Sequence, residues 1–145
     1  MEIIQEFKDE FRFLSNFYPS SIVLDGICYP TAEHAYQAYK TLDKNKRQGF
    51  SYIETPGLAK KAGRALEIRK DWDNVKLAIM FRIVFEKFKQ NPRLVEMLLS
   101  TENAWLVEGN NWGDSYWGKS FKTQNGENWL GRSLMLVRSV LQLSK

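Results

Sequence analysis

The sequence predicts a mainly α-helical fold, a compact helical domain with a small β-hairpin near its N-terminus. Apolar residues recur at helical spacing over residues 73–90 and 128–143. Only one strong hairpin signal is found, Asp25-Gly26 between two short runs that favour strands. Cap residues that typically start helices stand at Thr31, Thr55 and Asn91.

Length and composition indicate one globular domain over residues 1–145. A chain of 145 residues is long enough to bury a substantial core. Hydrophobic residues make up 43% and charged residues 26%, which is the balance of a folded chain. No linker, internal repeat or low-complexity tract divides the sequence.

The hairpin leads directly into the first helix. "SIVLDGICY", residues 21–29, reads as two short strands around Asp25-Gly26. Pro30 then ends the second strand, and Thr31 caps a helix over "AEHAYQAYK", residues 32–40.

On this helix Glu33, Gln37 and Lys40 are spaced i, i+4, i+7, so they are expected to share one face. The three form a continuous polar stripe of about two turns. Taken alone, the stripe favours a plain solvated helix face. His34 lies off the stripe and is expected to be a structural histidine.

The middle of the chain is predicted to be a loop followed by a helix. "DKNKR", residues 43–47, reads as an exposed loop. A helix begins at Thr55-Pro56, with proline in its first turn. The inner side of this helix is predicted to consist of Leu58, Ala62, Ala65 and Leu66.

The second half is predicted to be helical around one irregular stretch. A helix over residues 73–90 is followed by another that starts at Asn91-Pro92. Residues 104–109, "AWLVEG", read as a short strand or extended segment, and 110–126 as a loop rich in Gly, Asn and Trp. The last helix, residues 128–143, places four apolar residues at helical spacing: Leu130, Leu134, Val137 and Leu141.

Composition excludes several classes of protein. One cysteine, Cys28, cannot form an internal disulfide, and the charged N-terminus is no signal peptide, so a cytoplasmic protein is expected. With one His and one Cys, no metal site is expected. No glycine-rich phosphate loop is present, and no cofactor is expected. No serine stands in a recognisable nucleophile motif. The net charge of +4 mildly favours phosphates or nucleic acid as partners. No uncharged apolar run approaches the length needed to span a membrane, so no membrane partner is expected.

Three segments mix aromatic rings with short hydrogen-bonding groups. They are "RFLSNFYPS" (residues 12–20), the stretch 33–40, and "NNWGDSYWG" (110–118) with "NGENWLG" (125–131). Rings stack on flat bases, while Asn, Asp and Glu hydrogen-bond to sugar hydroxyls. A nucleoside-like ligand is therefore expected.

Six motifs in order across nearly the whole chain resemble the NADAR family, also called YbiA-like proteins. They are "FLSNFYPS", "LDG" with "YPTAEHAYQAYK", "AKKAGR", "KDWDNVK", "DSYWG" and "GENWLGRSLMLVR". Two departures stand out. Trp-Gly occurs twice, at 112–113 and 117–118, and the preceding Asp114 favours the second pair. "KSFKTQN", residues 119–125, follows no family pattern, and its basic residues suit a nucleic-acid phosphate.

The resemblance implies a mainly helical N-glycosidase that cleaves a bond between ribose C1′ and a nitrogen. It implies two kinds of substrate: ADP-ribose on guanine in DNA or RNA, or early riboflavin-pathway intermediates that carry ribose phosphate. The family's essential glutamate corresponds to Glu33 and its Schiff-base lysine to Lys40, with Lys60 and Lys61 as alternatives. Asp114 is the third catalytic candidate.

Eight further residues are expected to bind substrate by the same resemblance: Asn16, Phe17, Gln37, Arg64, Trp72, Trp117, Gly118 and Asn128. Each has a plain structural alternative. Trp72 and Trp117 are also typical core residues, and Arg64 could simply extend along the surface. Asn16 could hold a turn, and Asn128 could cap the last helix.

Elementary chemistry agrees with these roles. Breaking a C1′–N bond builds positive charge on the sugar, which a carboxylate stabilises. A lysine attacks carbon only as the neutral amine, so burial or nearby cations should lower its pKa. Two other classes stay open: a non-catalytic module that binds ADP-ribose or nucleic acid, and a basic DNA-binding protein.

Overall fold

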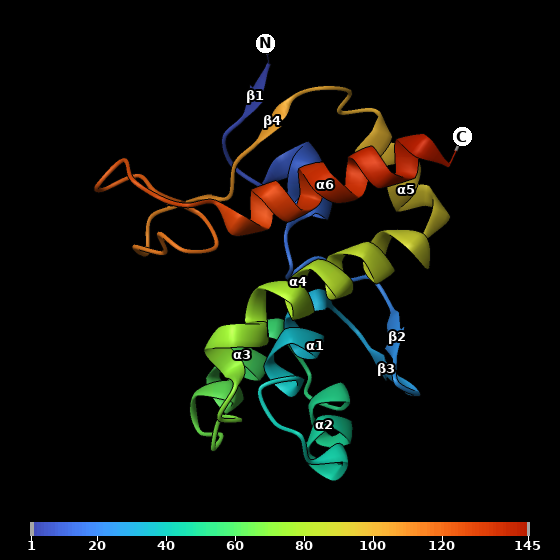
Figure 1. Cartoon of the computed structure of the whole chain (residues 1–145), viewed down its shortest axis with the longest axis vertical. Helices are drawn as coiled ribbons and strands as arrows, with labels where there is room; N and C mark the ends of the chain where they lie inside the picture. Colours follow the sequence, from blue (N-terminus) through green and yellow to red (C-terminus); the bar gives the residue numbers. More distant parts are fainter. Residues whose placement is uncertain (1, 145) are drawn as a thin grey trace. The chain divides into compact units, whose positions relative to one another are not determined.

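The mainly helical fold is confirmed by the structure, a computed structural model that describes residues 2–144 (Figure 1). The helices in this range are α1 (Ala32–Ala38), α2 (Lys44–Ser51), α3 (Pro56–Arg64), α4 (Trp72–Lys89), α5 (Pro92–Leu99), α6 (Trp129–Leu143) and the 3₁₀ helix η1 (Asp9–Leu14). The strands are β1 (Ile3–Ile4), β2 (Ile22–Leu24), β3 (Ile27–Tyr29), β4 (Trp105–Leu106), β5 (Gly109–Asn110) and β6 (Lys119–Ser120). No helix among these is both long and apolar enough to cross a membrane.

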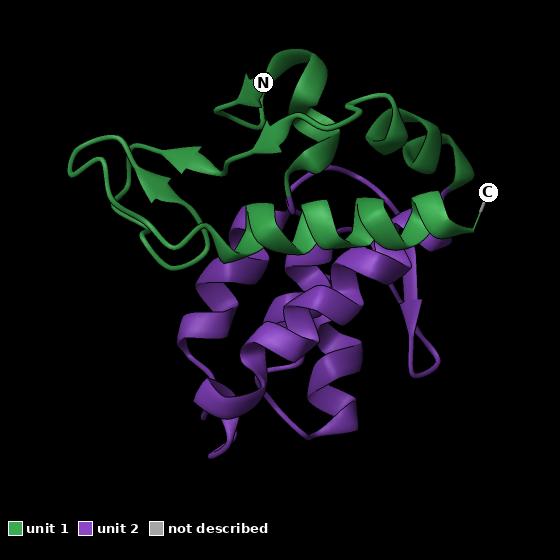
Figure 2. Cartoon of the chain, turned by 45° about the horizontal axis from the view of Figure 1, so that its top comes forward, with its two compact units in different colours: residues 1–15, 92–145 green, residues 16–91 purple. Residues whose placement is uncertain are grey.

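The chain divides into two compact units, drawn in two colours in Figure 2. Unit 1 comprises residues 1–15 and 92–145, and unit 2 comprises residues 16–91. The expectation of one domain over the whole chain stays a prediction.

Helix α1 is the centre of unit 2, where it contacts α2, α3 and α4. The predicted hairpin is confirmed: β2 and β3 pair antiparallel with Leu24 opposite Ile27. Asp25 and Gly26 both have positive φ, 49° and 83°, as expected for the central residues of a tight hairpin turn. Thr31 caps α1 as predicted, because its hydroxyl accepts a hydrogen bond from the His34 N–H at 3.1 Å.

Two predictions about unit 2 are wrong, one about the loop before α3 and one about the inner side of α3. Residues 44–51 form α2 instead of an exposed loop, because the Asp43 carboxylate caps it by accepting from the backbone N–H groups of Asn45 and Lys46. Only Phe50 of α2 is buried, so this segment lacks the apolar residues at helical spacing that would predict a helix.

The predicted inner side of α3 is also wrong. Ala59 and Gly63 are the buried residues of this helix, whereas Leu58 is 49% exposed. A Cβ on Gly63 would lie 1.9 Å from Gln37 Oε1, so α3 approaches α1 too closely for larger side chains. The face of α3 that contacts α1 is therefore formed by small residues and not by the large apolar ones.

Unit 1 is built around α6, which contacts α5 and β4. Strand β4 pairs in parallel with β1, and β5 pairs in parallel with β6. The predicted last helix is confirmed, with Leu130, Leu134 and Val137 buried. Asn128, however, does not cap it. Its backbone is left-handed, and its amide instead donates to Leu106 O at 2.8 Å and accepts from the Glu108 N–H at 2.9 Å.

Replacing Gly131 with Ala should destabilise the protein by about 1–3 kcal/mol, since overpacking a tight contact costs about that much. The added Cβ on α6 would lie 2.1 Å from Leu106 O. Gly49→Ala in α2 is the matched control, because a Cβ there meets no atom within 4 Å. Urea unfolding should show Gly131→Ala destabilised and Gly49→Ala unchanged or slightly stabilised. Equal midpoints for the two variants would contradict the close approach.

Candidate active site

The polar residues of α1 lie inside unit 2 and not on a solvated face. Glu33 is 7% exposed and Gln37 is 3% exposed, so the solvated-face interpretation is wrong for both. The Glu33 N–H donates to Asn16 O at 3.0 Å, which ties the first motif to the start of α1. Burying a carboxylate is costly unless it is compensated, so its position points to function.

Gln37 holds the Glu33 carboxylate. Its amide nitrogen donates to Glu33 Oε1 at 3.4 Å, one turn along the helix. Its amide oxygen is buried, with no hydrogen-bond partner within residues 2–144, and lies against Gly63 of α3. The close glycine therefore fixes the amide that orients the carboxylate.

Lys40 lies beyond α1, contrary to the prediction that it shares the helix face. The helix ends at Ala38, and the Lys40 N–H donates to Gln37 O at 3.2 Å in a tightened final turn. The Lys40 carbonyl then accepts from the Arg69 N–H at 2.8 Å, which directs the chain away from the helix axis.

Lys40 nevertheless interacts electrostatically with Glu33. Burial is the largest influence on this amine and lowers its pKa. The Glu33 carboxylate raises the pKa, while the cations Lys60, Arg64 and Lys76 lower it further. The Lys40 Nζ also lies 5.5 Å from the centre of the Tyr36 ring. The net lowering makes the neutral amine more available than in an ordinary lysine.

His34 is a structural residue, as predicted. It is fully buried, its Nδ1 lies 2.7 Å from the Thr31 hydroxyl, and its Nε2 lies 2.9 Å from Ile53 O. Because a carbonyl only accepts, Nε2 carries the proton and donates it. Burial lowers the pKa of His34, which favours this neutral form.

The other predicted residues of unit 2 differ in exposure. Trp72 is 8% exposed and packs on Tyr36 with ring centres 5.2 Å apart, as its core alternative expects. Phe17 is 43% exposed, and Arg64 at the end of α3 is exposed. The Asn16 amide lies 3.4 Å from Met80 Sδ.

Four predicted site residues lie in unit 1. Asp114 Oδ1 accepts from the N–H groups of Tyr116 and Trp117, both at 3.0 Å, so it holds the turn before Trp117. Gly118 is buried, and a Cβ there would lie 2.1 Å from Glu108 O. The choice of the second Trp-Gly pair as the family match stays a prediction. The side-chain amide of Asn128 hydrogen-bonds to the backbone of Leu106 and Glu108.

The structure thus divides the predicted residues into seven in unit 2 and four in unit 1. Sequence reasoning assigned no site role to Tyr36 or Lys76, although both influence Lys40. Lys76 belongs to the "KDWDNVK" motif, which was a usable signal. Tyr36 lies four residues before Lys40, and this i, i+4 spacing in the predicted helix over residues 32–40 was also a usable signal.

The unit 2 cluster can perform acid-base and amine chemistry. It offers a buried carboxylate, an amine of lowered pKa and a guanidinium suited to phosphate. Within residues 2–144, no three His, Cys, Asp or Glu side chains are grouped so that they could hold a metal ion.

Comparison with known proteins points to one family. The model of the NADAR domain matches residues 4–142. The N-glycosidase YbiA of Escherichia coli is 37% identical over 139 residues, covering 94% of this chain and 86% of that protein. A riboflavin biosynthesis protein of Vibrio vulnificus is 39% identical over 132 residues, covering 90% of this chain but only 35% of that protein. The NMR structure of E. coli YbiA superposes with a TM-score of 0.84 at 34% identity, covering 99% of this chain and 89% of that one.

Proposed function

The chain belongs to the NADAR domain family, and from that premise we propose that it is an N-glycosidase that cleaves a ribose C1′–N bond. The name of the E. coli relative supports this reaction. The observation that carries the proposal is the buried Glu33 carboxylate, held by Gln37 and coupled electrostatically to a lysine of lowered pKa. A binding module would need neither group.

The proposed substrate is ADP-ribose attached to guanine in nucleic acid. Support comes from the net charge of +4 and from the cations around Lys40, which suit a diphosphate. The second candidate is a ribosylaminopyrimidine phosphate from early riboflavin synthesis. The name of the Vibrio relative favours it, although this chain spans only about a third of that protein.

In the proposed mechanism the neutral Lys40 amine attacks C1′ and displaces the base. The C1′–N bond to the base breaks while a C1′–Nζ bond forms, and Glu33 gives its proton to the departing nitrogen. The bond from C1′ to the ring oxygen then breaks as Nζ gives a proton to that oxygen, and the opened sugar is held as a protonated imine. Water adds at C1′ and gives a proton to Glu33, which passes it to Nζ. The C1′–Nζ bond then breaks, and the sugar leaves with an aldehyde at C1′.

The remaining proposed roles concern binding. Arg64 and Asn16 would hold phosphate and ribose, and Phe17 and Trp72 would border the base. For Asp114, Trp117, Gly118 and Asn128, which lie in unit 1, we keep the roles that the family resemblance implies. For Asp114 and Asn128 the role would include shaping the backbone, because their side chains already bond to it.

A release assay tests the proposal. Wild type and Glu33→Gln would each be incubated with an ADP-ribosylated guanosine oligonucleotide and with a ribosylaminopyrimidine phosphate. Mass spectrometry should detect free ADP-ribose from the oligonucleotide with wild type only. Release of ribose phosphate from the pyrimidine alone would transfer the assignment to the second candidate. Bound ligand without any product would instead support the binding-module class.

The rate of adduct formation at Lys40 should rise with pH and level off with a midpoint below lysine's ordinary value of 10.5. The reason is that the neutral amine reacts, and burial with nearby cations favours that form. Borohydride trapping between about pH 6 and pH 10 measures the midpoint.

Removing a neighbouring cation should move this midpoint upward. Lys60→Gln and Arg64→Gln each remove a charge that lowers the pKa of Lys40. Lys46→Gln on the exposed part of α2 is the charge-matched control and should leave it unchanged. If the midpoint in all three variants equals that of wild type, these cations do not influence the pKa of Lys40.

A further inference from the structure

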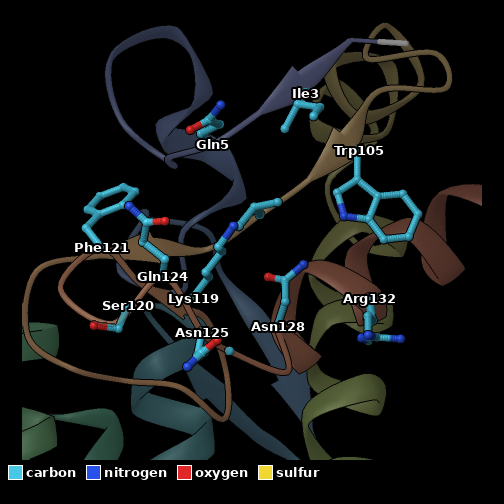
Figure 3. A pocket seen from close by; sticks show the side chains of 12 residues that line it. Ile3, Gln5, Trp105, Lys119, Ser120, Phe121, Gln124, Asn125, Asn128 and Arg132 are labelled. Atoms are coloured by element: carbon cyan, nitrogen blue, oxygen red, sulfur yellow. The ribbon is translucent and has the colours of Figure 1, made fainter.

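Unit 1 contains a cavity of about 690 Å³ that neither Glu33 nor Lys40 lines (Figure 3). Strands β1 and β4 contribute Ile3 and Trp105, β6 contributes Lys119, and α6 contributes Arg132. The volume falls within the range of about 300–1,000 Å³ that is usual for small-molecule sites. Of the predicted site residues, Asn128 alone lines it.

Two aromatic rings of the cavity remain open to solvent. Trp105 is 43% exposed and Phe121 is 36% exposed. In the view of Figure 3 they lie at opposite sides, with Lys119 and Asn128 between them. Exposed rings at the wall of a cavity offer flat surfaces on which a base can stack.

The cavity is positively charged. Its lining includes Lys119 and Arg132, and none of its lining residues is acidic. Arg132 Nε donates to Glu127 O at 2.6 Å, which fixes the guanidinium in place. The two terminal nitrogens of Arg132 make no hydrogen bond within residues 2–144. The Lys119 ammonium forms no ion pair in the same range. Such a pair of cations suits a phosphate.

Polar groups between the rings complete the lining. They are Gln5, Ser120, Gln124, Asn125 and Asn128. The Ser120 hydroxyl is buried with no hydrogen-bond partner in the described part of the chain. Amides that both donate and accept can bond to a sugar or to base edges.

We propose that this cavity binds one nucleotide, with the base on Trp105 and the phosphate at Lys119 and Arg132. The same chemistry fits a nucleotide within a single strand of nucleic acid and a free mononucleotide. It also gives a function to "KSFKTQN", the segment without a family pattern. The inference does not rest on the proposed glycosidase activity, because neither Glu33 nor Lys40 lines this cavity.

The test is fluorescence anisotropy with a labelled, unmodified single-stranded DNA of about ten nucleotides, which carries no ADP-ribose for the proposed glycosidase to release. Lys119→Gln/Arg132→Gln should weaken binding about tenfold or more. It should also lower the slope of log K against log salt by about 0.7, because the two cations contact one phosphate of the strand. Trp105→Ala should weaken binding at least about fivefold, the loss of one stacked base.

Lys89→Gln/Arg93→Gln is the matched control, since it removes two exposed cations that do not line the cavity. Circular dichroism establishes that each variant is folded. Displacement of the strand by a mononucleotide would identify a free nucleotide as the ligand, and failure to displace it would identify the strand. The proposal is overturned if wild type binds neither probe, or if both double variants lose affinity equally.

Discussion

Replacing Glu33 with Gln should lower kcat by about 10²–10⁴-fold, the usual contribution of a general acid or base, while substrate affinity changes little. The amide keeps the shape of the carboxylate and can still accept from Gln37, whose nitrogen lies 3.4 Å from Glu33 Oε1. What it loses is the proton transfer and the negative charge near C1′. Single-turnover release of ADP-ribose measures the rate, and the dependence of that rate on substrate concentration measures substrate affinity.

Glu54→Gln provides the control, because Glu54 is exposed in the turn before α3. Its activity should equal that of wild type. Thermal unfolding should show Glu33→Gln at least as stable as wild type, since it removes a buried charge. Full activity in Glu33→Gln would remove this residue from the mechanism, whereas unfolding would show that the carboxylate serves the fold.

The sequence predicted those parts of the fold that have local signals. The hairpin turn at Asp25-Gly26 and the caps at Thr31 and Thr55 were predictable from their turn and cap residues. The long helices α4 and α6 were predictable from their apolar residues. Helix α2 was missed because it depends on the Asp43 cap and buries little. The face of α3 was misjudged because close approach of two helices selects small residues, which hydrophobicity does not reveal.

The residues of the candidate site could be predicted from the sequence, but their arrangement in space could not. Glu33 and Gln37 share one face of α1 as their i, i+4 spacing requires. Lys40 interacts with Glu33 although the helix ends before it. Its pKa is lowered first by burial and then by Lys60, Arg64 and Lys76, which lie 20 to 36 residues further along the chain. Tertiary packing brings these cations together, and no local pattern encodes that.

Replacing Lys40 with Met should abolish the borohydride-trapped adduct and lower kcat on the order of 10³-fold or more, as expected when a nucleophile is removed. Met keeps the length and apolar stem of the side chain but lacks the ammonium that lies 5.5 Å from the centre of the Tyr36 ring. Peptide mapping of the wild-type adduct should place it on Lys40. Lys60→Met and Lys61→Met are controls for the alternative lysines and should still form the adduct.

The same substitution should also stabilise the protein at neutral pH. Because burial and neighbouring cations lower the pKa of Lys40, folding disfavours its ammonium, and the unfolded chain binds the proton more tightly. Wild-type stability should therefore rise as pH increases from the lowered pKa towards 10.5, and Lys40→Met should lack this rise. A variant that is more stable yet inactive would show that the lysine is kept for chemistry at a cost to the fold. A variant that is less stable and still forms an adduct would move the nucleophile to Lys60 or Lys61.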